Sequence, residues 1–261
     1  MYTIEILDAD GQVKHLVAGD DYAHLVYAKA YEAGDSIFFT AGAQHCALQV
    51  DMTLPEAFVF LPQKRFVYKI PKGEERTMYS PQAFGGEKHV ITLRPAKDWE
   101  ISARRNLALN PLDQRFYEGC YPHALANVET RNEPQFFARN VIDGMKCSHS
   151  HGTWPYQSWG IGGRTDAEIT IHFGRVVSVE EVGITLRADF PHDSWWCKGL
   201  LTYSDGHQMP LSFEKTGATQ YFSFGETKIE WIRLSDLVMA DEPSPYPALT
   251  EFEVFGRDIL S

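Results

Sequence analysis

Two acidic segments that lie far apart in the chain have the residue types of a cation site. The first runs from Asn140 to Ser148 and contains Asp143 followed by Gly144, which permits a sharp backbone bend. The second, residues 249–256, alternates like a strand and places Glu251 on the face opposite Phe252. Two carboxylates, with carbonyl groups freed by the turn, form the oxygen cage that hard cations such as calcium prefer. The sequence therefore predicts a calcium clasp that ties a closing strand to an acidic turn in mid-chain.

The composition predicts a folded chain without affinity for anionic partners. Its 261 residues are 44% hydrophobic and 13% aromatic, enough for one large or two medium domains with buried cores. The formal charge of −11 argues against nucleic acid and anionic membranes, which both bind basic faces. No apolar run reaches the roughly 18 residues of a membrane-spanning helix. Cations and neutral ligands are the partners that this charge favours.

The compartment is predicted from the beginning of the chain and from the cysteines. Residues 1–5 contain neither a basic segment nor an apolar signal core, which predicts a cytoplasmic protein. A chain trimmed of its leader would look the same and would be extracellular. The four cysteines are widely spaced, without a C-x-x-C pair, which is typical of reduced thiols.

Short strand patterns fill the chain, and long helical periodicity is absent. Residues 46–50 alternate buried and exposed types between turn signals, and similar runs recur through residues 1–104. Residues 22–32 are compatible with a short helix or a strand. A charged stretch, 97–105, precedes a second series of strand patterns in residues 105–261. We therefore expect an all-β chain with an N-terminal β-sandwich domain of unknown role and a second β-sandwich domain.

Within the second half the pattern also predicts where strands stop. Strands are expected at 167–173 and 179–186, separated by a turn at Gly174–Arg175. The polar region that precedes residue 133 is expected to be rich in loops. Two aromatic loops, His149–Gly163 and Phe190–Trp196, interrupt the strands.

Six segments of the second half carry a family resemblance in their order along the chain. They are Asn106–Ala108, Val141–Gly144, Ile169–Gly174, Tyr203–Gly206, Trp231–Leu234 and Leu249–Gly256. Together they resemble the coagulation factor 5/8 type C, or discoidin, family, which overlaps with the family 32 carbohydrate-binding modules. The resemblance covers roughly residues 105–256 and implies the galactose-binding-like jelly-roll fold.

The resemblance also implies a ligand set for the calcium clasp. In sugar-binding members of the family, a structural calcium ion lies where the Asp-Gly turn meets the last strand. The implied ligands are the Asn140, Met145 and Thr250 carbonyls, the Asp143 and Glu251 side chains, and the carbonyl and hydroxyl of Ser148. The alternatives are sodium or water in the same cage, or an Asp143 that caps its turn beside a solvated Glu251.

The family binds its ligands through loops at one end of the sandwich, using aromatic, histidine and arginine side chains. The resemblance implies a set of sugar-binding candidates: His149, His151, Trp154, Tyr156, Arg164, Arg187, Asp189, His192, Asp193, Trp195 and Trp196. An indole face stacks on the C–H face of a pyranose, and arginine and aspartate pair with hydroxyl groups. As alternatives, Trp154 and Trp159 close the end of the barrel, Trp195 and Trp196 divide between surface and core, and Arg187 serves a structural ion pair.

A rival site lies in the same loops. Cys147, His149 and His151 alternate, so in an extended segment they share one face, and with Asp189 or His192 they form a zinc or other transition-metal site. Such a site would make the chain a metal-dependent enzyme acting on a carbohydrate, because metal-bound water is a nucleophile near neutral pH. The alternative for each histidine is a hydrogen-bonded loop residue.

The sequence thus predicts a non-catalytic carbohydrate-binding protein, with a calcium-stabilised discoidin-like domain. The alternatives are the metal-dependent enzyme and an intracellular protein-interaction module. The N-terminal domain is expected to dock a protein partner or a second copy of the chain.

Overall fold

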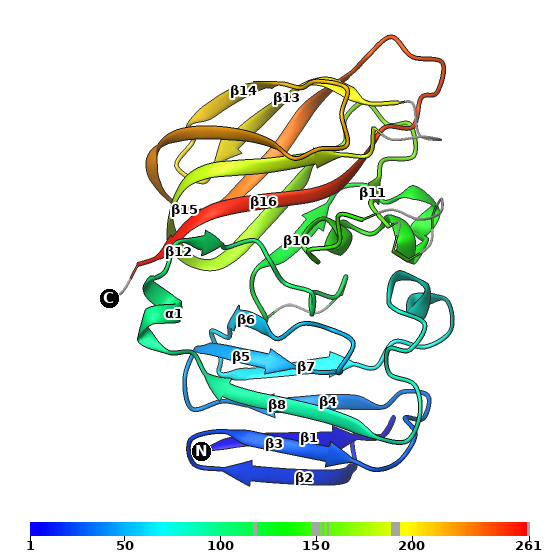
Figure 1. The fold of residues 1–261 in the computed structure, drawn as a ribbon, viewed down its shortest axis with the longest axis vertical. Helices are drawn as coiled ribbons and strands as arrows, with labels where there is room; N and C mark the ends of the chain where they lie inside the picture. The colour runs from blue at the N-terminus through cyan, green and yellow to red at the C-terminus, as the bar shows by residue number, and fades with distance from the viewer. Residues whose placement is uncertain (117–118, 148–151, 153, 156, 189–193, 260–261) are drawn as a thin grey trace.

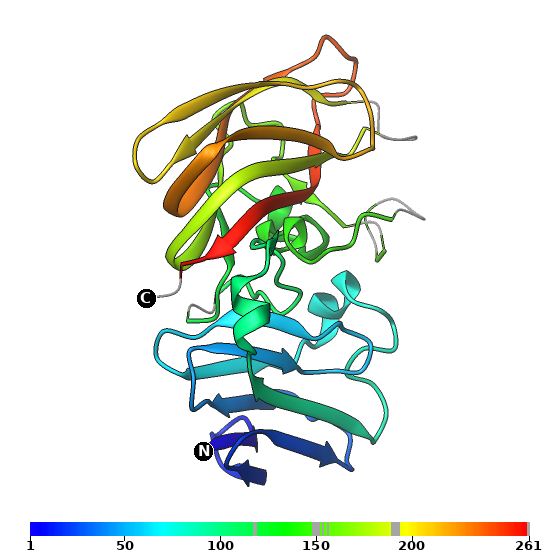
Figure 2. The ribbon, with the colours of Figure 1, turned by 60° about the vertical axis from the view of Figure 1, so that its left-hand side comes forward.

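A computed structural model describes residues 1–116, 119–147, 152, 154–155, 157–188 and 194–259. Strands dominate, and the two halves of the chain are stacked end to end in both views (Figures 1 and 2). The described residues contain one α-helix, α1 (Asp98–Ser102), which lies where the two halves meet. The all-β prediction is confirmed.

The first half is a sandwich of two four-stranded antiparallel sheets, ordered β2-β1-β4-β7 and β3-β8-β5-β6. The strands are β1 (Tyr2–Leu7), β2 (Val13–Gly19), β3 (Ala23–Tyr27), β4 (Ser36–Thr40), β5 (His45–Gln49), β6 (Ala57–Phe60), β7 (Arg65–Lys69) and β8 (His89–Pro95). Alternation in β1 turns Tyr2, Ile4 and Ile6 into the core, where they meet Leu25 and Leu93 of the other sheet. The segment 22–32, for which the sequence allowed a helix or a strand, contains the strand β3.

The second half is one antiparallel sheet of eight strands folded around its own hydrophobic core. The strands are β9 (Arg105–Asn106), β10 (His123–Ala126), β11 (Trp159–Gly160), β12 (Ile169–Leu186), β13 (Trp196–Tyr203), β14 (Gln208–Ser212), β15 (Gln220–Met239) and β16 (Ala248–Asp258). Short 3₁₀ segments connect the strands: η1 (Gly73–Met78) lies between β7 and β8 of the first half, and three more lie between β10 and β11, namely η2 (Thr130–Asn132), η3 (Pro134–Phe136) and η4 (Ala138–Val141). β12 lies at the centre and pairs with β10, β15 and β16.

One local prediction in this half is wrong. Gly174 and Arg175 do not end a strand, because β12 passes through them with a shift of register between His172 and Val177. Such a bulge bends a strand without ending it. The region before residue 133, predicted to be rich in loops, has mostly loops and turns among its described residues. It also contains the short strand β10, which pairs with the first part of β12.

The two halves are joined by main-chain and charged contacts. Phe60 and Tyr121 form an isolated antiparallel bridge, with N···O distances of 2.9 and 3.0 Å. Asp258, at the end of β16, accepts hydrogen bonds from Arg105 and Arg175 and contacts His45 of β5. The first core also includes residues from beyond position 104, namely Leu112, Cys120 and Phe137. The role of residues 1–104 in docking a partner stays a prediction.

Candidate functional site

The acidic turn and the last strand lie against each other. The Gly144 N–H donates to Glu251 Oε1 at 3.2 Å, and the Met145 N–H donates to Asp143 Oδ1 at 2.8 Å. Glu251 has no exposed surface. Burial raises the pKa of Glu251 well above its usual range, and the charge of Asp143 raises it further. Burial also raises the pKa of Asp143. Two buried carboxylates of like charge therefore act on each other across this contact.

One oxygen of this pair fits a bound cation. Glu251 Oε2 is buried and has no hydrogen-bond partner in the described part of the chain, and a buried polar atom without a partner calls for a water or an ion. Asp143 Oδ2 is already engaged: it accepts from Gln157 Nε2 at 3.0 Å and lies 3.5 Å from Arg139 Nη1. The guanidinium of Arg139 supplies part of the positive charge that the carboxylates require.

The other calcium ligands predicted among the described residues are main-chain oxygens. Within residues 1–259, leaving aside the gaps in the described ranges, no group of three or more His, Cys, Asp or Glu is placed to hold a metal ion. The carbonyls predicted for Asn140, Met145 and Thr250 would complete the shell, and Ser148 lies outside the described residues. The set fits a hard cation in chemistry, and the ion itself stays a prediction.

Several predicted sugar-binding residues fall outside the described part of the chain. These are His149, His151, Tyr156, Asp189, His192 and Asp193. Of the rival metal site only Cys147 is described. It is exposed, with its Sγ 3.1 Å from Met145 Sδ. The transition-metal prediction therefore stays open.

Two of the predicted ligand residues belong to the interior. Trp196 is 1% exposed and packs on the buried Trp159, with ring centroids 6.2 Å apart. Arg187 is also 1% exposed, and its Nη1 donates to Ser158 Oγ at 3.0 Å. Neither presents a face to a ligand at the surface, which corrects the prediction for both. Trp159 donates from Nε1 to the Val128 carbonyl at 2.8 Å and closes this end of the core.

The other described candidates lie nearer the surface. Trp154 is half-buried where the two halves of the chain meet, and its main-chain N–H donates to the Thr77 carbonyl at 3.2 Å. Trp195 is half-buried and donates from Nε1 to Glu242 Oε1 at 3.3 Å. Its alternation with the buried Trp196 matches the expectation that one tryptophan is core and the other is not. Arg164 is exposed.

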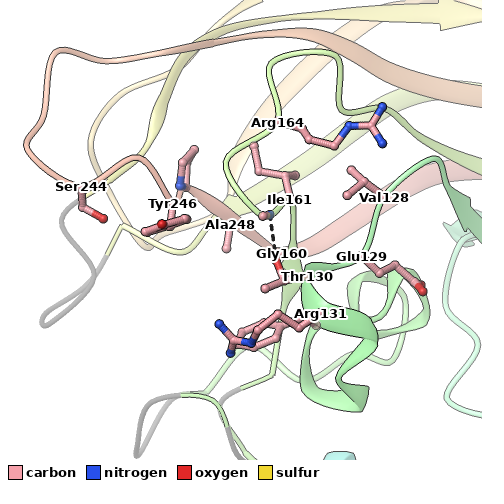
Figure 3. A pocket seen from close by; sticks show the side chains of 13 residues that line it. Val128, Glu129, Thr130, Arg131, Gly160, Ile161, Arg164, Ser244, Tyr246 and Ala248 are labelled. Atoms are coloured by element: carbon pink, nitrogen blue, oxygen red, sulfur yellow. Dashed lines mark hydrogen bonds between the residues drawn. The ribbon is translucent and has the colours of Figure 1, made fainter.

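A cavity of about 670 Å³ opens between three segments of the second half (Figure 3). Residues 128–131 follow β10, residues 160–164 follow the start of β11, and residues 244–248 lead into β16. Ser194 Oγ donates to the Ser244 carbonyl, so the segment that holds Trp195 adjoins the cavity. Of the predicted candidates, Arg164 lines it.

The cavity combines an exposed aromatic ring with apolar walls and hydrogen-bonding groups. Tyr246 is 57% exposed, and Phe136 and Ile161 supply apolar surface. Thr130 Oγ1 accepts from the Gly162 N–H at 2.8 Å and ties two of the segments together (Figure 3). A Cβ at Gly160 would lie 2.7 Å from Thr130 Oγ1, so glycine keeps this approach close.

Sequence reasoning missed most of this lining. Thr130 and Arg131 lie in a region read as a polar loop, and Phe136 follows it. Their neighbours in space come from residues more than twenty positions away. Tyr246 gave a signal, because it is an aromatic residue between Pro245 and Pro247 just before the closing strand. The described residues contain no helix with the length and apolar character that a membrane crossing requires.

No protein-family model matches the sequence, and no curated protein matches it. Solved structures are similar in fold. A chitosan-binding module of a chitosanase/glucanase from Paenibacillus sp. IK-5 is 20% identical over 58% of this chain and 99% of that chain, with a TM-score of 0.41. The family 32 carbohydrate-binding module of C. perfringens NanJ, solved with galactose, is 17% identical over 51% of this chain and 91% of that chain, with a TM-score of 0.39. A Ruminococcus gnavus family 29 fucosidase, solved with fucose, is 19% identical over 59% of this chain and 27% of that chain, with a TM-score of 0.43.

What each of those proteins binds is a property of that protein. Function in this chain has to be argued from its own residues.

Proposed function

We propose that the chain is a non-catalytic carbohydrate-binding protein and that the sugar lies in the cavity of Figure 3, against Tyr246. The observation that carries the proposal is an exposed aromatic ring at the mouth of a cavity whose walls are partly apolar and partly polar. The C–H face of a pyranose stacks on such a ring, while its hydroxyl groups need donors and acceptors nearby. Thr130, Ser244 and the exposed Gly162, which all line the cavity, supply them.

The affinity of one such site is expected to be weak. The cavity converges few polar groups on a ligand that is well hydrated in water, which predicts a dissociation constant of roughly micromolar to millimolar. The enclosed volume of about 670 Å³ lies within the range of small-molecule sites in proteins.

Tyr246→Ala tests the placement of the sugar. A glycan array followed by isothermal titration with the best-bound glycan should show binding by the native chain and loss of about tenfold or more in Tyr246→Ala, because the stacking platform is removed. Tyr221→Ala is the matched control, since Tyr221 is exposed to nearly the same extent, 55% against 57%, on a different surface. If both variants bind the glycan equally well, the sugar does not lie against Tyr246. If the native chain binds no glycan, the proposed function is refuted.

We further propose that a structural calcium ion lies between Asp143 and Glu251. Bound there, it would neutralise two buried carboxylates and satisfy Glu251 Oε2. At a hundred times its dissociation constant, calcium should stabilise the fold by about 2.7 kcal/mol, seen as a rise in Tm over a chelated sample. Glu251→Gln should abolish this rise, whereas Glu253→Gln, two residues along β16, should keep it. A Tm that does not respond to calcium in the native chain would refute the ion.

A further inference from the structure

Two arginines line the proposed sugar cavity on opposite sides. Figure 3 shows Arg164 and Arg131 across the cavity from each other, with Thr130 and Tyr246 between them. The other ionisable side chain among the described lining residues, apart from Tyr246, is Glu129, and it is turned away from a ligand. Its Oε2 pairs with Arg115 Nε at 2.5 Å, and its Oε1 accepts the Ala138 N–H at 2.8 Å.

Each arginine is held by a carboxylate two residues along the chain. Arg131 donates from Nε and Nη2 to Glu133 at 2.6 and 2.7 Å, and Arg164 donates in the same way to Asp166 at 2.8 and 2.5 Å. Neither carboxylate is among the residues that line the cavity. Within the described ranges, Nη1 of both arginines has no hydrogen-bond partner, and each Nη1 carries two N–H donors.

The turn that carries Arg131 is held in an uncommon conformation. Arg131 and Asn132 both have positive φ, 50° and 54°, which is costly for residues other than glycine. Arg115 Nη2 donates to Asn132 Oδ1 at 2.6 Å, and the Arg131 guanidinium lies 5.6 Å from the centre of the Phe136 ring. The hydrogen bonds and the charge of the Glu133 carboxylate raise the pKa of Arg131, so its guanidinium stays positively charged.

We infer that the ligand is an acidic glycan, whose ring stacks on Tyr246 while its carboxylate takes N–H groups from Arg131 and Arg164. This inference rests on the proposed function. Guanidinium groups offer donors only, and charge-assisted bonds to a carboxylate are about twice as strong as neutral ones. The chain as a whole, with its charge of −11, would repel an anion, so the preference has to come from these two side chains.

A glycan array with neutral, uronate-bearing and sialate-bearing oligosaccharides tests the inference and separates the two sources of a sugar carboxylate. The acidic glycan that binds best is then titrated beside its carboxyl methyl ester, which keeps the ring and the linkages. We expect the ester to bind about tenfold more weakly. Arg131→Gln and Arg164→Gln should each lose about tenfold for the acid and little for the ester.

Arg233→Gln is the control, because Arg233 of β15 is a surface arginine that is also paired with a carboxylate, that of Glu168. It should bind the acid like the native chain. If the array shows neutral glycans bound as well as acidic ones, or if the ester and the acid bind equally, the inference fails and the proposed function stands. If the array shows no bound glycan, both fail.

Discussion

Asp258→Asn is expected to destabilise the protein at the contact between its two halves. The Asp258 side chain is 1% exposed, accepts from Arg175 Nε and from Arg105 Nη2 at 2.5 Å, and lies 3.3 Å from His45 Nε2. The two guanidinium groups also stack on rings of β6, Arg105 over Phe58 at 4.0 Å and Arg175 over Phe60 at 4.8 Å. Asparagine would keep the shape and leave both positive charges without their counter-ion.

The magnitude follows from burial. Removing one partner of a fully buried ion pair costs about 3–5 kcal/mol. The arginines keep some contact with water, 11% for Arg175 and 21% for Arg105. We therefore expect a loss near the lower end, about 3 kcal/mol in the free energy of unfolding, or roughly a hundredfold in the unfolding equilibrium. Urea titration followed by fluorescence and circular dichroism measures it.

The stability lost in Asp258→Asn should be larger at neutral pH than in acid. Burial alone would raise the pKa of Asp258, but the hydrogen bonds from His45 and Arg175 and the charges of both arginines bring it well below its usual value. A carboxyl whose pKa is depressed in the folded state adds stability above its unfolded pKa of about 3.9, and that stability is lost as the pH falls. The gap between native chain and Asp258→Asn should therefore be largest near pH 7 and shrink below pH 4.

Asp205→Asn is the matched control. Asp205 pairs with His207 in an exposed hairpin turn at 2.9 Å, and exposed pairs contribute about 0–1 kcal/mol. An Asp258→Asn variant that unfolds at the same urea concentration as this control at pH 7 would refute the reasoning, as would a gap that grows in acid.

Two further predictions concern buried rings. Tyr31→Phe should raise the free energy of unfolding by about 1 kcal/mol, measured by urea titration, because the buried Tyr31 hydroxyl has no hydrogen-bond partner in the described part of the chain. The phenylalanine ring would keep the contacts of the tyrosine ring with Tyr27 and His89. A lower free energy of unfolding would instead reveal a partner for the hydroxyl, such as an internal water. Trp196→Ala should cost about 3–5 kcal/mol by the same measurement, because its ring fills the core against Trp159; a cost below 1 kcal/mol would contradict this placement.

The strands of the first half could be predicted because local pattern and burial agree there. In β1 every second residue is buried, and turn signals at Asp10–Gly11 bound the strand pair. In β12 the local pattern and the tertiary packing disagree. Gly174, with a φ of 67°, gives the local signal of a turn, yet it lies in a β-bulge within the strand, because the chain packs closely there. A Cβ there would lie 2.4 Å from the Tyr121 ring, a contact that no local pattern reveals.

For the functional site, the sequence predicted the types of side chain better than it predicted where they lie in the fold. The meeting of Asp143 and Glu251 followed from two local signatures and a family resemblance. For Trp196 and Arg187, residue type suggested ligand binding, but burial depends on what packs against them, here Trp159 and Ser158. The cavity draws on three separated segments, so its lining appears only when the chain folds.

The central claim, that a sugar occupies this cavity, is tested most directly by mapping the bound ligand on the backbone. Two-dimensional amide NMR of the labelled chain, titrated with the glycan that binds best, should show shifts concentrated in residues 128–131, 160–164 and 244–248. Tyr246→Ala should remove those shifts while the rest of the spectrum stays folded. Shifts that cluster on another surface, or a spectrum that no glycan changes, would contradict the account.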